Sequence, residues 1–271
     1  MSFLKSSAAE NFWFEIKAYL RHCIAARSRH GVHSPFVFDL ITKVLSSRNR
    51  FFDFSIVEAE RKKLLRDHSI LHVDDFGVGS RLNLSEKRKV SQIAATALQS
   101  KVCAQAFSKI VQHFRPEKVL ELGTSLGITT SYLALANSDC HVWTIEGATE
   151  VSDRAGNVFA SLGLNRVQRV CGRFDDVLSS VLDEMNTVDF ALMDGHHAYQ
   201  PTMRYFNQIV ERCHENSIVI LDDIHWSREM EKAWSEIAQR SDVTASLDFF
   251  HFGVVFFQST REKEHFILKS P

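Results

Sequence analysis

A short apolar segment that ends in a glycine turn constrains this chain more than any other feature of its sequence. Residues 118–122 are apolar or β-favouring, Gly123 and Gly127 follow, and residues 128–136 have the pattern of a helix. An apolar run that ends in such a turn and continues as a helix predicts the first strand–helix step of a nucleotide-binding type of fold. Glycine at the end of the strand lets a ligand approach the backbone, where a Cβ atom would collide with it.

The spacing of these glycines differs from the dinucleotide-binding fingerprint. That fingerprint reads G-x-G-x-x-G, but Ser125 and Ile128 stand where its second and third glycines would follow Gly123. The turn instead has the form E-x-G-x-x-x-G and begins at Glu121. The spacing therefore disfavours a pyrophosphate-binding loop, and with it an NAD-dependent dehydrogenase.

Strand and helix patterns alternate regularly from residue 118 onward. Strands are expected at 118–122, 141–146, 166–171, 188–194, 217–222, 245–251 and 253–258. This alternation predicts an α/β fold with a Rossmann-like, doubly wound and mainly parallel seven-stranded sheet. Only a turn at Gly253 separates the last two strands, so we expect the last strand to be antiparallel.

The first 100 residues show helical patterns without this alternation. Residues 3–26 predict an amphipathic helix, Ser34-Pro35 starts a second one, and helices are also expected at 57–67 and 87–114. We divide the chain into an N-terminal helical region with a lid, 1–100, and a Rossmann-like domain, 101–271.

The expected lid is the irregular segment 68–86. It contains the glycine-rich string DFGVGS at residues 75–80, but the flanking residues form neither a buried strand nor an apolar helix start. We interpret it as a mobile loop near the site and not as the main cofactor loop.

Composition excludes several classes of protein. The net charge is −1 and the pI about 6.9, so no overall positive field attracts nucleic acid or anionic membrane. No run reaches the roughly 18 apolar residues of a membrane span, and the first 20 residues lack a signal-peptide core. The five cysteines are scattered without a CxxC pair, which favours reduced thiols in a cytoplasmic protein. The phenylalanines concentrate near both ends, which suggests aromatic packing or a homodimer interface.

In open parallel sheets, ligands bind outside the carboxyl ends of the strands, so the strand ends predict a site. These ends carry Glu121 to Gly127, Glu146-Gly147, Gly172 to Asp176, Asp194 to His197, and Asp222 to His225. Glu146 follows Glu121 by 25 residues and is placed like the acid that binds both ribose hydroxyls. The alternative is that Glu146 only caps the following helix. A ribose, no pyrophosphate and a negative rim together favour a sulfonium nucleoside as ligand.

Five motifs in this order resemble class I S-adenosylmethionine-dependent methyltransferases. They are VLELGTSLGITTSYLA, WTIEG, GRFDD, VDFALMDGHHAY and IVILDDI, and the resemblance covers about residues 95–258. The ELGxxxG form and the paired aspartates are most similar to the catechol and caffeoyl-CoA O-methyltransferase branch. The DGxHxY string is similar to a broader methyltransferase group.

The resemblance assigns the cofactor site residue by residue. It implies that Gly123, Thr124, Ser125 and Gly127 flank the methionine part of S-adenosylmethionine, with Glu121 and Asp194 beside them. Glu146 with Gly147 would hold the ribose. Phe174 and Asp175, after Gly172, would lie beside the adenine.

The resemblance also implies a metal site and a base. Asp194, Asp222 and Asp223 fall on the family's ligands for a divalent metal, Mg²⁺, although the family has Asn where Asp223 stands. The family's Lys base falls on His197. Asp222 or Asp223 could instead cap the next helix, and His196 could be a solvated neighbour of His197. Trp226 could stack on a substrate or be a surface aromatic residue.

The sequence thus predicts an enzyme that transfers methyl from S-adenosylmethionine to a hydroxyl of a small-molecule acceptor with the help of a divalent metal. One alternative is a metal-independent N- or O-methyltransferase with His197 as base. Another is a non-catalytic module that uses the cofactor fold for assembly.

Overall fold

The structure is a computed structural model that describes residues 2–28, 31–46, 53–73, 87–259 and 262–270, with side chains from residue 12 onward. Its helices are α1 (Ser2–Ala25), α2 (Pro35–Asp39) with the π-helical η2 (Leu40–Leu45), α3 (Ser55–Leu64), α4 (Val90–Ala97), α5 (Lys101–Phe114), α6 (Ile128–Ala136), α7 (Thr149–Ser161), α8 (Phe174–Met185), α9 (Tyr199–Val210) and α10 (Arg228–Gln239). Its strands are β1 (Ile70–His72), β2 (Lys87–Lys89), β3 (Lys118–Leu122), β4 (His141–Glu146), β5 (Val167–Cys171), β6 (Val188–Met193), β7 (Cys213–Asp222), β8 (Ala245–Asp248), β9 (Phe252–Phe256) and β10 (Glu264–Ile267).

Within these residues, one eight-stranded sheet runs in the order β10-β8-β9-β7-β6-β3-β4-β5. Its neighbours pair in parallel except at β9, which is antiparallel to both β7 and β8. The chain proceeds from β3 outward to β5 and then returns to β6 on the other side of β3. This reversal is the topological switch point of a doubly wound sheet, where ligands bind. The predicted fold class is confirmed.

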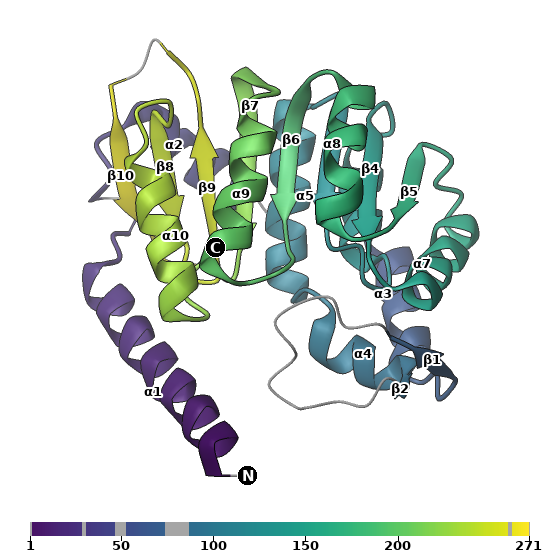
Figure 1. The fold of residues 1–271 in the computed structure, drawn as a ribbon. Coiled ribbons are helices and arrows are strands. Elements are labelled where there is room, and N and C mark those ends of the chain that lie inside the picture. The colour runs from purple at the N-terminus through teal and green to yellow at the C-terminus, as the bar shows by residue number, and fades with distance from the viewer. Residues whose placement is uncertain (1, 29–30, 47–52, 74–86, 260–261, 271) are drawn as a thin grey trace.

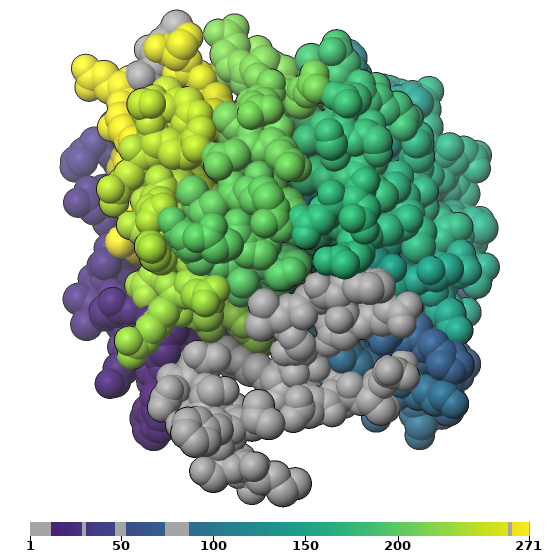
Figure 2. Space-filling view, in the orientation of Figure 1, coloured from purple at the N-terminus to yellow at the C-terminus, as the bar shows by residue number. Residues whose placement is uncertain are grey.

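Helices cover both faces of the sheet because its central strands are apolar on both faces. On β3, Val119 packs into one core with residues of α5 and α6. Leu120 and Leu122 point into the other core, with residues of α8, α9 and α10. In Figure 1, α8, α9 and α10 lie in front of the sheet and α5 behind it. Figure 2 shows the side chains of these front helices covering that face in adjacent bands. Such two-sided burial is typical of parallel strands.

Several predicted boundaries were wrong. The edge strand β10 was not predicted, and the strand expected at 245–251 ends at Asp248, where a turn begins. The helix expected at 87–114 is a strand and two helices, because the backbone is extended at Leu98 and Ser100 caps α5 by accepting the Cys103 N–H. Part of the expected lid is regular, since β1 pairs with β2. Residues 74–86, with the DFGVGS string, lie outside the described residues.

The N-terminal region is helical as predicted, but it does not have a core of its own throughout. Val37, Leu40 and Val44 of α2 and η2 belong to the same core as α5 and the sheet. The division of the chain at residue 100 stays a prediction. On α1, the expected apolar stripe is largely exposed at Phe12, Leu20 and Ile24. Among the described residues, no helix has the length and apolarity to span a membrane.

Candidate active site

The register of the sheet brings the predicted strand-end residues to one level. Leu122 pairs with Ile145 on one side and with Met193 on the other, and Met193 pairs with Leu221. The next residues along these four strands are Gly123, Glu146, Asp194 and Asp222. Hydrogen bonds continue the ladder past the strands, from Gly123 N to Ile145 O at 3.0 Å and from Asp194 N to Leu122 O at 2.9 Å. Neighbouring parallel strands lie about 5 Å apart, so these residues form a continuous rim.

Glycine is required at position 123 because two strand ends meet there. Its φ is +103°, and a Cβ atom on it would lie 1.9 Å from the carbonyl oxygen of Asp194. The turn continues through Ser125, at φ +47°, to Gly127, which precedes α6 at φ +80°. The Ser125 hydroxyl oxygen is buried and has no hydrogen-bond partner among the described residues. This turn therefore presents its backbone and a polar atom at the centre of the rim.

Glu146 ties this turn to the end of β4. Its Oε2 accepts the Ser125 N–H at 2.9 Å, and its Oε1 accepts the Ala148 N–H at 3.0 Å. Ala148 is the N-cap residue of α7, so the predicted capping role is present. Burial raises the pKa of Glu146, while these N–H donors oppose the shift. Gly147 is a third backbone donor, and a carboxylate has about four lone-pair sites, so capacity remains for a ligand hydroxyl.

Glu121 lies fully buried beneath the turn. Its Oε2 accepts the hydroxyls of Thr130, at 2.5 Å, and Thr144, at 2.6 Å, whereas its Oε1 has no hydrogen-bond partner among the described residues. The Thr144 hydroxyl also lies 2.6 Å from that of Thr124. Burial raises the pKa of Glu121 to about 8. The two threonines were not predicted, although a glutamate inside a buried strand requires donors on its neighbours.

Asp194 and Asp222 form a pair of carboxyl groups on the adjacent ends of β6 and β7. Burial, followed by the negative charges of Asp194 and Asp223, raises the pKa of Asp222 well above its ordinary value. Burial also raises the pKa of Asp194 to about 6, and His197 opposes this. A smaller influence on the Asp222 pKa comes from a hydrogen bond with the Gln99 side chain, which sequence reasoning missed.

The three-aspartate metal site stays a prediction. Within the described ranges, no group of three or more His, Cys, Asp or Glu side chains is arranged to hold a metal ion. Asp223 has a left-handed backbone, at φ +52°, and its N–H donates to the His251 carbonyl at 2.6 Å. Its negative charge nevertheless adds to the raised pKa of both Asp194 and Asp222.

His197 lies beside this pair. Its Nε2 is 3.7 Å from Asp194 Oδ1, and both side chains are partly exposed. The Trp226 ring, on the loop after β7, is half-buried and centred 6.4 Å from the His197 ring. His196 is not simply a solvated neighbour, because its Nδ1 is buried and its ring lies against Tyr205. An acceptor bound here could therefore contact both the His197 imidazole, a possible base, and the Trp226 ring.

The predicted adenine neighbours begin α8. Phe174 packs edge-to-face on Tyr205, with ring centres 5.5 Å apart, and closely approaches Gly195. Asp175 accepts the Tyr205 hydroxyl at 2.9 Å and pairs with Arg204 at 2.6 Å. Burial would raise the pKa of Asp175, but these two donors outweigh it and lower the pKa. Gly147 and Gly172 directly follow β4 and β5.

Comparison with known proteins agrees with this geometry. Residues 120–224, less than half of the chain, match the family model described as a methyltransferase domain. No curated protein matches the sequence. The structure is similar to that of an O-methyltransferase from Bacillus cereus in complex with S-adenosylhomocysteine, at 18% identity and a TM-score of 0.56, over 82% of this chain and 97% of that one.

Two further solved structures show the same fold. The O-methyltransferase of tomaymycin synthesis from Streptomyces achromogenes, in complex with S-adenosylmethionine, is 20% identical at a TM-score of 0.52, over 60% of this chain and 83% of that one. A methyltransferase from Geobacter sulfurreducens is 14% identical at a TM-score of 0.54, over 81% and 96%. Together with the family model, these likenesses confirm the resemblance drawn from the sequence motifs.

Proposed function

We propose that this chain transfers a methyl group from S-adenosylmethionine to the hydroxyl oxygen of a small-molecule acceptor, and the match of residues 120–224 to a methyltransferase-domain model supports this. The observation that supports this most strongly is the link between Glu146 and the turn at Gly123–Gly127. An acid with remaining acceptor capacity stands beside a partly buried glycine turn at the switch point of the sheet. The non-catalytic alternative gives no reason for several buried ionisable groups on one rim.

We assign the cofactor to the β3–β4–β5 half of this rim. Glu146 would accept the ribose hydroxyls, and the turn with Thr124 and Ser125 would lie along the methionine part. Phe174 would offer a ring face or edge to the adenine. The acidic rim suits the positive sulfonium, because opposite charges attract strongly where water is excluded.

We assign proton removal to His197. The acceptor oxygen attacks the methyl carbon as the bond from carbon to sulfur breaks, leaving S-adenosylhomocysteine, and the hydroxyl proton passes to His197 Nε2. Asp194, 3.7 Å from that nitrogen, would stabilise the imidazolium that results. The rest of the catalytic effect would come from holding oxygen, carbon and sulfur in line.

This proposal routes no step through a metal ion. The branch of methyltransferases that the sequence resembles uses one, and Asp194, Asp222 and Asp223 are the residues that would hold it here. The O-methyl assignment follows the structural neighbours, which are described as O-methyltransferases. The acceptor region of the rim lies around His197 and Trp226, and an aromatic alcohol would suit their rings.

Turnover of a catechol probe tests the assignment of the base. The protein is incubated with S-adenosylmethionine and the probe, and S-adenosylhomocysteine is quantified by mass spectrometry. His197→Ala should lower turnover by roughly 10²- to 10⁴-fold, as loss of a general base does, whereas His141→Ala, an exposed histidine on β4, should not. Turnover by His197→Ala at the wild-type rate would reject this base. Turnover abolished by a chelator and restored by Mg²⁺ would favour the metal-dependent reaction.

A further inference from the structure

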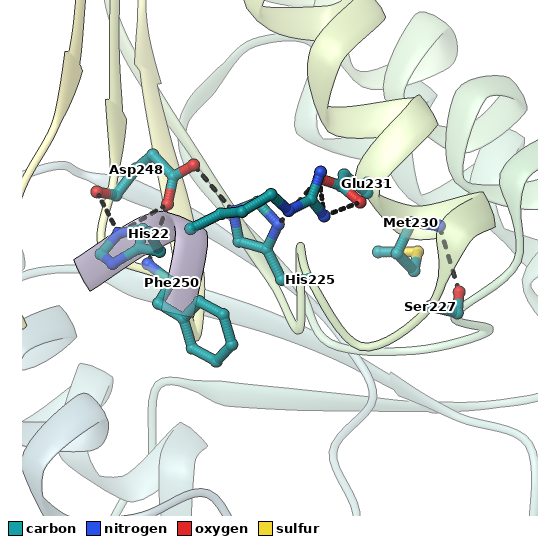
Figure 3. A network of polar contacts seen from close by, with 8 residues as sticks. His22, His225, Ser227, Met230, Glu231, Asp248 and Phe250 are labelled. Carbon is teal, nitrogen blue, oxygen red and sulfur yellow. Dashed lines mark hydrogen bonds and ion pairs between the residues drawn. The ribbon is translucent and has the colours of Figure 1, made fainter. Parts of the chain in front are cut away.

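A second group of buried polar residues lies beyond the rim, where α1 meets the end of β8. Asp248 is almost fully buried, and two histidines from distant parts of the chain bind its carboxylate. His225 Nε2 lies 2.8 Å from Asp248 Oδ2, and His22 Nε2 lies 3.2 Å from Oδ1. The Phe250 N–H donates to Oδ1 at 2.9 Å. We call these four residues the Asp248 network (Figure 3).

Aromatic contacts make the network compact. The Phe250 ring stacks on His225, with centres 5.2 Å apart and planes 15° apart. It also meets His22 edge-on at 5.4 Å and Tyr19 at 5.0 Å. Phe250 has a φ of +72°, a left-handed conformation that costs a non-glycine residue about 1–2 kcal/mol. The bond from its N–H to Asp248 holds the turn in this conformation.

Further charged groups lie around the network on α1, α10 and β10. On β10, burial lowers the pKa of His265 and the negative charge of Asp248 opposes this. Arg21 is taken by Glu231, at 3.0 Å. His225 Nδ1 is 3.9 Å from Glu231 Oε1 and makes no hydrogen bond among the described residues. His225 is therefore held mainly by Asp248, at 2.8 Å, and not by Glu231.

His225 belongs to the loop that carries Trp226 to the proposed acceptor region. This loop, residues 223–227, joins β7 to α10. It is tied to the β8–β9 turn at two points: the Asp223 N–H binds the His251 carbonyl, and His225 binds Asp248. The Trp226 N–H closes a turn onto the Asp223 carbonyl at 2.9 Å. Asp248 is thus linked to Trp226 through His225, its neighbour in the sequence.

We propose that Asp248 is a positioning residue for the acceptor side of the site, holding His225 so that the loop 223–227 keeps Trp226 beside His197. His22 completes the carboxylate's set of donors and so couples the docking of α1 to this loop. The proposal rests on the proposed function only in that Trp226 flanks the acceptor. The geometry of the loop can be tested without any methyl transfer.

The test is fluorine NMR of the full chain labelled with 5-fluorotryptophan. The chain has four tryptophans, Trp13, Trp143, Trp226 and Trp234, and Trp226→Phe identifies the resonance of Trp226. Asp248→Asn should shift or broaden the Trp226 resonance beyond its linewidth and leave that of Trp143, on β4, in place. Asp242→Asn is the matched control, because Asp242 pairs with Arg240 near the surface and does not touch His225.

His22→Ala keeps the test decisive if Asp248→Asn does not fold. This variant removes one donor from the carboxylate and should shift the Trp226 resonance less than Asp248→Asn does. His22→Gln should leave that resonance near its wild-type position, because the glutamine amide can donate to Asp248. An unchanged Trp226 resonance in every folded variant would overturn the proposal. So would equal shifts of Trp226 and Trp143, which would indicate a general structural loss. Absence of methyl transfer would reject the proposed function and leave this result intact.

Discussion

Glu121 and Asp248 lie near the carboxyl ends of two strands of one sheet, at 0% and 3% exposure. Their surroundings nevertheless shift their pKa values in opposite directions. Glu121 receives two hydroxyl donors on a single oxygen, and burial raises its pKa to about 8. Asp248 receives nitrogen donors on both oxygens. Burial would raise its pKa as well, but His22, His225 and the Phe250 N–H outweigh it and hold the pKa well below its usual range.

The difference shows that burial alone does not decide the charge of a carboxyl group. A carboxylate keeps its charge when enough N–H donors compensate for its lost hydration, and it takes up a proton when they do not. The region beneath the Gly123 turn therefore holds a neutral acid at neutral pH, while the Asp248 network holds an anion. We therefore expect the stability of the protein at neutral pH to be insensitive to loss of a charge at Glu121 and to depend on the charge of Asp248.

The largest expected effect is at Asp248. Asp248→Asn should lower the free energy of unfolding by about 3–5 kcal/mol, because it removes the buried charge and replaces one acceptor oxygen by an NH2 group that faces another donor. Urea denaturation at pH 7 measures this loss. Asp39→Asn, which breaks only an exposed pair with Lys43, should cost under about 1 kcal/mol. A loss at Asp248 no larger than at Asp39 would remove the contrast with Glu121.

The next effect concerns how the contribution of each carboxyl group to the free energy of unfolding depends on pH. The folded-state pKa of Glu121 is raised to about 8, so its contribution to stability is complete below about pH 4.5 and is lost as the pH rises through 8. Glu121→Gln resembles the protonated acid and should abolish this part of the slope. Relative to the variant, the wild type should lose on the order of 3 kcal/mol between pH 5 and 8.

Asp248 should contribute no slope over the same range. Its pKa is lowered, so its stabilisation is present above the unfolded value near 4 and disappears only as the pH falls below it. Urea titrations of wild type and Glu121→Gln at several pH values provide the measurement. Parallel pH profiles for the two proteins would mean that Glu121 is charged in the folded state.

The region around Glu121 could be predicted from the sequence, whereas the Asp248 network could not, and the difference has a physical reason. Buried parallel strands give continuous apolar runs, and a turn that needs positive φ needs glycine, so the ends of β3 and β4 at Glu121 and Glu146 were placed correctly. The Asp248 network joins residues that are far apart in the sequence and share no periodic pattern. The short β10, EHFI, carries two polar residues in four and gave no apolar signal.

Binding of S-adenosylhomocysteine, measured by calorimetry, tests the central claim most directly, because it asks whether the Glu146 rim is a cofactor site. The wild type should bind it in the micromolar range and bind NAD far more weakly. Glu146→Ala should weaken binding by roughly 1.5–3 kcal/mol, as loss of hydrogen bonds to a charged acceptor does. Asp153→Ala, on the exposed side of α7, should leave the affinity unchanged. No binding by the wild type, equal affinity for NAD, or unchanged affinity in Glu146→Ala would contradict the account.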